Sequence, residues 1–183
     1  MESLISLLIE SETNTLLVQN QHASFCTLSL IEQTPGFKES NFQVFSTMLQ
    51  LIGMLASADK AFGKACVQFI IPIILPKLAD IKTNIACSKC FDKLVEAVGP
   101  GYVVEQVFNS VLEQKNPKAQ SEAINWVASM LEDFGLMTVS INNVIAKLKL
   151  FLESTSPLVK SASIKVLLLN YWRQIIIIVF FAF

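Results

Sequence analysis

The sequence predicts an all-α protein in which about eight helices stack in pairs as an α-solenoid. Its 183 residues are 52% hydrophobic and 16% charged, which excludes a disordered tail and favours a well-buried fold. Apolar residues recur at helical spacing along most of the chain, and strict strand-like alternation is hard to find. The six glycines and six prolines lie mostly between the periodic segments, where they would separate one helix from the next.

The N-terminal part of the chain is expected to contain four helices. Residues 2–10 and 21–33 would form two helices separated by a polar stretch. Residues 42–57 carry apolar side chains on two neighbouring rows, which is typical of a helix buried between others. Residues 61–79 follow, and Pro72 and Pro76 should bend or end that helix.

The middle of the chain contains strong helix-start and helix-stop signals. A helix over 84–98 is expected to end at Gly99-Pro100-Gly101. Residues 102–114 place several valines and a phenylalanine on one side of a further helix. Asn116 is a natural N-cap and Pro117 suits the first helical position, so the next helix should span 117–134.

The C-terminal part is expected to contain two helices and an apolar tail. The first of these helices would span 140–153, and Ser156-Pro157 should open the second, over 157–172. We therefore expect a helical domain over 1–172 and a separate apolar tail over 173–183. After Gln174 the tail offers nine uninterrupted apolar residues, against the roughly 20 that a membrane-spanning helix needs.

A lysine recurs near the turns that open into helices. Lys38, Lys82, Lys118 and Lys160 follow one another at steps of 44, 36 and 42 residues. Helix-pair repeats of the HEAT type have about this period, and their equivalent turns line up along one edge of the solenoid. Two interpretations stay open from the pattern alone: a row of lysines that forms a shared binding surface, or ordinary solvated lysines near helix starts.

At these same turns the sequence resembles the TOG domain of the ch-TOG and mini spindles type of microtubule-associated protein, most closely its second TOG domain. The resemblance covers approximately residues 15–170, and the matching motifs occur in order. They are the stretches 35–44, 78–82, 114–122 with Asn125-Trp126, 132–135 and 156–160. The Asn-Trp-Lys turn that usually begins such a domain has no counterpart before Phe37, so the first tubulin-contacting turn is expected to be absent and the first repeat to be incomplete.

The resemblance implies a non-enzymatic, monomeric domain that binds the αβ-tubulin heterodimer through its intra-repeat turns and contributes to microtubule assembly and spindle organisation. It places the protein in the cytoplasm on the cytoskeleton, at microtubule ends, spindle poles and the centrosome. Tubulin is strongly acidic, so a row of ammonium groups would steer association. Carried over by position, the expected tubulin contacts are Phe37, Lys38, Lys82, Lys115, Lys118 and Lys160. Phe37 would be the apolar anchor, or would instead fold back onto its own helix pair.

Enzymatic and metal-dependent functions find no support in the sequence. Cys87 and Cys90 form a CxxC, but no second pair exists and the single histidine, His22, lies in another segment, so we expect buried thiols and no metal or cofactor. A net charge of −1 disfavours a nucleic-acid partner. Two alternative functions remain: a HEAT-repeat scaffold for another acidic protein and, with less support, a helical protein anchored in a membrane by residues 174–183.

Overall fold

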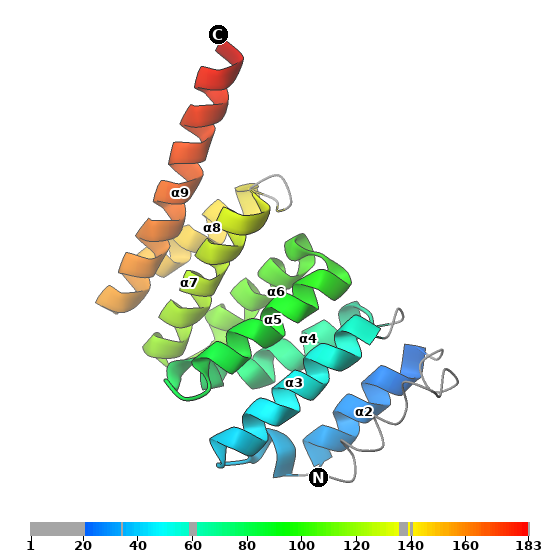
Figure 1. Ribbon diagram of the computed structural model, residues 1–183. Coiled ribbons are helices and arrows are strands. Elements are labelled where there is room, and N and C mark those ends of the chain that lie inside the picture. The colour runs from blue at the N-terminus through cyan, green and yellow to red at the C-terminus, as the bar shows by residue number, and fades with distance from the viewer. Residues whose placement is uncertain (1–20, 34, 59–61, 136–138, 140, 183) are drawn as a thin grey trace. The chain divides into compact units, whose positions relative to one another are not determined.

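The structure, a computed structural model, describes residues 21–33, 35–58, 62–135, 139 and 141–182. These residues form eight α-helices and two short 3₁₀ helices, which confirms the predicted all-α class (Figure 1). The helix expected over 2–10 lies outside the described residues. The chain divides into two compact units, which we describe separately.

Unit 1 is built around two long helices that lie side by side. Its elements are α2 (Gln21–Gln33), η2 (Pro35–Lys38), α3 (Phe42–Ala58), α4 (Lys64–Ile74) and α5 (Asn84–Val98). Helix α3 packs along α5, and α2 packs against both η2 and α4. Figure 1 shows that α3 and α5 run in the same direction, so both helices start at the same end of the unit. Phe45, Ile52, Ile70 and Phe91 are among the fully buried side chains of this core.

Unit 2 repeats the arrangement with a second pair of long helices. Its elements are η3 (Leu75–Ala79), α6 (Pro100–Glu113), α7 (Pro117–Phe134), α8 (Ile141–Leu152) and α9 (Pro157–Ala182). Helix α7 packs against α9, α6 and η3, and α8 packs against α9. Both α7 and α9 run in the same direction (Figure 1). The rings of Phe108 and Phe151 stack at a centroid distance of 5.8 Å within this core.

The local stop and start signals act as the sequence predicts at α5 and α7. The Asn116 Oδ1 accepts a hydrogen bond from the Lys118 backbone N–H at 3.0 Å, and Pro117 occupies the first helical position. Gly99 and Gly135 follow α5 and α7 with φ angles of 97° and 79°, a region that favours glycine. Their N–H groups close the two helices on Val95 O and Leu131 O.

Three helix bounds differ from the sequence expectation. The segment expected to be one helix over 61–79 consists of α4, which continues through Pro72, followed by the 3₁₀ helix η3. The change comes just before Pro76, because a second proline without an N–H would again interrupt the α-helical hydrogen bonds. Helix α6 starts at Pro100 rather than at 102, because proline is well tolerated at the first helical position.

The last difference concerns the C-terminus. Helix α9 continues to Ala182 and does not end near 172, so it crosses the boundary expected between a domain and a separate tail. Its later residues contain neither proline nor glycine to stop the helix. Among the residues that the structure describes, no helix is both long enough and apolar enough to cross a membrane.

Candidate binding edge at the intra-repeat turns

Four turns lead into the four long helices and share one construction. They span 39–41 (first turn), 80–83 (second turn), 114–116 (third turn) and 153–156 (fourth turn). In each turn a short polar side chain accepts a hydrogen bond from the backbone N–H two residues later. The pairs are Asn41 Oδ1 with Gln43 N and Asp80 Oδ1 with Lys82 N, both at 3.0 Å, Asn116 Oδ1 with Lys118 N at 3.0 Å, and Ser154 Oγ with Ser156 N at 3.2 Å. These bonds fix the backbone from which the predicted lysines project.

The two turns of unit 1 lie at the same end of the α3–α5 pair. In the first turn the Glu39 Oε1 also accepts from Ser40 N at 2.9 Å and from Asn41 N at 3.0 Å. In the second turn the Lys82 ammonium lies 5.6 Å from the centroid of the Phe42 ring, which begins α3. This cation–π contact joins the residue that opens one long helix to the turn that opens the next.

The two turns of unit 2 are tied down by a comparable set of hydrogen bonds. The Gln120 Nε2 donates to Gln114 O at 2.7 Å and to Val111 O at 3.1 Å, so the side chain of α7 closes the end of α6. The Asn116 N–H donates to Gln114 Oε1 at 3.0 Å. In the fourth turn the Lys160 N–H donates to Ser156 O at 3.2 Å. Both long helices of unit 2 therefore start from ordered turns.

The five predicted lysines are all exposed: Lys38, Lys82, Lys115, Lys118 and Lys160. Within the described part of the chain, no ion pair or hydrogen bond is found for their ammonium groups, whereas Lys93 and Glu96 on α5 form an ion pair. The structure brings Lys38 and Lys82 into unit 1 and the other three into unit 2. Each unit thus presents exposed ammonium groups at its turns, with the Glu39 and Asp80 carboxylates of unit 1 accepting hydrogen bonds from the backbone.

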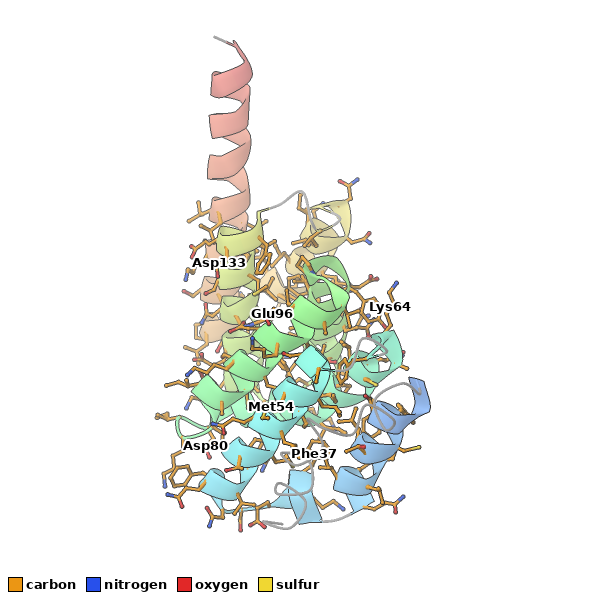
Figure 2. All side chains as sticks on the ribbon, turned by 45° about the vertical axis from the view of Figure 1, so that its right-hand side comes forward. Phe37, Met54, Lys64, Asp80, Glu96 and Asp133 are labelled. Atoms are coloured by element: carbon orange, nitrogen blue, oxygen red, sulfur yellow. The ribbon has the colours of Figure 1, made fainter. Side chains whose placement is uncertain are left out.

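The expectation that Phe37 protrudes as an anchor needs correction. The ring is only 7% exposed, which is the folded-back alternative that the sequence left open (Figure 2). The physical reason is that η2 packs against α2 and α3, so the apolar ring is removed from water between the helices of unit 1. Phe37 supports the first turn from inside.

The structure also shows exposed apolar residues at the turns that sequence reasoning did not select. Ile81 in the second turn is 81% exposed, and Leu158 in the first turn of α9 is 56% exposed. A signal was present for Ile81, because this aliphatic residue stands directly before Lys82 in a turn, where polar residues are usual. Helical periodicity could not reveal Ile81, because a turn residue belongs to no helix face.

Unit 1 carries a groove of about 1050 Å³ that runs from the second turn along the helices. Residues of α2, α3 and α5 line it, and its walls include Ile85, Lys89 and Met54. Figure 2 labels Met54 on α3. Lys82 also lines this groove. The positive charge at the second turn is therefore continuous with a partly apolar surface.

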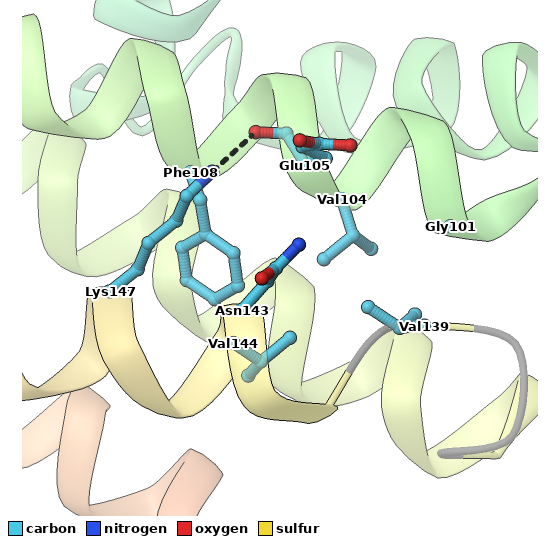
Figure 3. Close-up of a pocket in the computed structure, with 8 residues that line it drawn as sticks. All are labelled: Gly101, Val104, Glu105, Phe108, Val139, Asn143, Val144 and Lys147. Atoms are coloured by element: carbon cyan, nitrogen blue, oxygen red, sulfur yellow. Dashed lines mark hydrogen bonds between the residues drawn. The ribbon is translucent and has the colours of Figure 1, made fainter.

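Unit 2 contains a smaller hollow of about 180 Å³ between α6 and α8, and Lys147 closes it (Figure 3). The Lys147 Nζ donates to Asn109 Oδ1 at 2.6 Å and to Glu105 O at 3.4 Å, which clamps α8 to α6. Partial burial lowers the pKa of Lys147, and the Glu105 carboxylate opposes this shift. The volume lies below the roughly 300–1000 Å³ typical of small-molecule sites, so we interpret the hollow as a packing feature.

The CxxC of α5 is a pair of buried thiols. Cys87 and Cys90 are 0% and 3% exposed, and burial, with the neighbouring Cys87 as a second cause, raises the pKa of Cys90 well above its usual range. Among the described residues, no group of three or more His, Cys, Asp or Glu could hold a metal ion. The thiolates that zinc requires are thus disfavoured here.

The four cysteines should differ sharply in reactivity. Cys26 is exposed, whereas Cys66, Cys87 and Cys90 are buried, so we expect one thiol to react with a disulfide reagent such as Ellman's reagent before unfolding and four after it. Cys26→Ser should abolish the fast native reaction. Rapid reaction of two or more thiols in the folded protein, or zinc-dependent protection of the CxxC, would contradict this arrangement.

Three proteins of known name are similar to this chain in sequence. Protein MOR1 of Arabidopsis thaliana is 36% identical over 139 residues, 75% of this chain. Protein mini spindles of Drosophila melanogaster is 35% identical over 131 residues, 72% of this chain, and Centrosomal protein 224 of Dictyostelium discoideum is 27% identical over 146 residues. The chain spans only 7% of MOR1 and 6% of mini spindles. No family profile matches the chain.

Solved structures extend this similarity to the fold. The third TOG domain of Drosophila mini spindles superposes with a TM-score of 0.78 at 30% identity, covering 88% of this chain and 70% of that domain's chain. A second TOG structure, 17% identical, superposes with a TM-score of 0.64 and covers 85% of this chain, which supports the fold alone. The paired helices and capped turns of the two units agree with these similarities. The chain belongs to the TOG-domain family of MOR1, mini spindles and their relatives.

Proposed function

We propose that this chain binds the αβ-tubulin heterodimer through the lysines of its four turns and so contributes to microtubule assembly and spindle organisation. The observation that carries the proposal is the set of five exposed ammonium groups in or beside four turns, each of which contains a hydrogen bond from a backbone N–H to a short polar side chain. For the more distant TOG structure, the specificity of TOG–tubulin binding is described as promoting microtubule dynamics and mitotic spindle formation. A tubulin surface rich in carboxylates would complete the charge pairs that these lysines lack.

The proposal assigns contacts turn by turn. Lys38 and Lys82 act from unit 1, Lys115 and Lys118 from the third turn, and Lys160 from the start of α9. Phe37 contributes by holding the first turn in place. Because an exposed ion pair is worth only about 0–1 kcal/mol, several such contacts must act together. The finer assignments also belong to this proposal: a monomeric domain most like a second TOG domain, located at microtubule ends, spindle poles and the centrosome.

Titration of the purified chain with unpolymerised tubulin tests the proposal directly. We expect a one-to-one complex by gel filtration and isothermal calorimetry at low salt, and weaker binding at about 0.15 M salt, where exposed charges more than about 8 Å apart are screened. Bovine serum albumin, another acidic protein, is the control for unspecific charge attraction. Absence of a tubulin complex at both salt concentrations, or equal binding to the control protein, would refute the assignment.

A further inference from the structure

Exposed apolar side chains gather around one predicted contact lysine. Ile81 is 81% exposed, Ile85 is 66% exposed and Phe42 is 43% exposed, and all three lie at the end of unit 1 where α3 and α5 start. In the chain Lys82 lies between Ile81 and Ile85. Its ammonium nitrogen lies 5.6 Å from the centroid of the Phe42 ring. An apolar cluster that stays in water is a mark of a binding surface, whereas single exposed apolar residues are ordinary.

The second turn holds Ile81 in a fixed position. The Asp80 Oδ1 accepts from Lys82 N at 3.0 Å, and the Asp80 carbonyl oxygen accepts from Thr83 N at 3.1 Å and from Asn84 N at 2.9 Å. These three bonds run from Asp80, before Ile81, to the three residues after it, so they fix the backbone of Ile81. A side chain on a pre-ordered turn loses little conformational entropy when a partner covers it, so more of its burial free energy is available for binding.

Neither chance exposure on a helix face nor local turn stability explains why Ile81 is exposed in the second turn. Leu30 on α2 is 61% exposed, but it is one residue on a helix face and belongs to no such cluster at a turn. A turn position gains nothing from an aliphatic side chain in local stability, because polar residues and glycine suit turns better. Phe37, the aromatic residue expected to serve as the anchor, is buried.

We infer that Ile81 is the apolar anchor of unit 1, with the Phe42 ring that Lys82 covers as a second apolar contact, and that it packs against an apolar spot on tubulin whose neighbouring carboxylate meets Lys82. The inference rests on the proposed function and names its binding determinant. It commits to a mixed contact, in which aliphatic burial supplies affinity and the ammonium group supplies orientation. Lys82 and Ile85, which follow the anchor in the chain, also line the groove of unit 1.

Two substitutions separate the apolar part of this contact from its charge. Ile81→Ser should weaken tubulin binding about tenfold, because burial of an isoleucine side chain is lost, while the dependence of affinity on salt stays as in the wild type. Lys82→Ala should instead reduce the salt dependence. Leu30→Ser is the matched control, an exposed apolar residue of the same unit away from the turns. Circular dichroism should show that all three variants keep the wild-type helix content, since the altered side chains are exposed.

The outcomes distinguish the anchor from the proposed function. If the wild type binds tubulin and Ile81→Ser binds within twofold of it, the anchor is refuted and the lysine contacts stand. An equal loss in Leu30→Ser would also refute the anchor, because the effect would then follow exposed apolar residues in general. If the wild type itself fails to bind, the proposed function and the anchor fall together.

Discussion

Reversing the charge of Lys118 and Lys160 together should lower the affinity for tubulin by at least tenfold. Each residue is exposed at the start of a long helix of unit 2, one after the third turn and one after the fourth. Replacing an attraction of about 1 kcal/mol with a repulsion of similar size at two positions exceeds the 1.4 kcal/mol that corresponds to a factor of ten. Calorimetry of Lys118→Glu with Lys160→Glu at low salt measures the loss, and the difference from the wild type should shrink as salt is added.

A charge-matched double variant makes this test specific to position. Lys64 and Lys165 are exposed, on α4 and within α9, so Lys64→Glu with Lys165→Glu changes the net charge by the same amount away from the four turns. We expect this control to lose less than threefold in affinity, through the long-range field alone. Equal losses in the two double variants would show that tubulin responds to net charge and would exclude the turn lysines as the contact surface.

Helix bounds were predictable where a local interaction determines them. The start of α7 is set by the Asn116 side chain and by the fixed φ of Pro117, and both act within two residues. The end of α5 follows from Gly99 in the same way. The end of α9 was predicted wrongly, because an apolar segment without proline or glycine contains no local signal that separates helix from tail.

The side chains of the candidate site were only partly predictable, because exposure depends on packing between elements. The lysines were recognisable from their recurrence, since a charged side chain at a turn remains in water in almost any packing. Phe37 and Ile81 look alike in the sequence, as apolar residues each followed by a lysine in a turn. One is 7% exposed and the other 81% exposed, because η2 packs onto α2 and α3 while the second turn carries Ile81 outward. This difference in exposure depends on how the elements pack and cannot be read from the sequence around either residue.

Truncation of Phe108 should be among the most damaging single changes to the stability of unit 2. The ring is 1% exposed and stacks on Phe151 at a centroid distance of 5.8 Å, so it joins α6 to α8. Phe108→Ala removes this buried volume and leaves a cavity, which typically costs about 3–5 kcal/mol of the free energy of unfolding. For a chain of this size each kcal/mol lowers the melting temperature by about 2–4 °C, so thermal unfolding followed by circular dichroism should shift by about 10 °C.

The control for this truncation is the same deletion at an exposed phenylalanine. Phe134 ends α7 and is 50% exposed, so Phe134→Ala should cost about 1 kcal/mol or less. Phe151→Ala and the double variant complete a cycle: if the two rings interact, the double loss should fall short of the sum of the single losses by about 0.5–1.5 kcal/mol. Equal melting temperatures for Phe108→Ala and Phe134→Ala would show that the α6–α8 contact does not stabilise unit 2. Because the third and fourth turns follow α6 and α8, a weakened unit 2 should also bind tubulin less well near its melting temperature, while its affinity at low temperature stays close to that of the wild type.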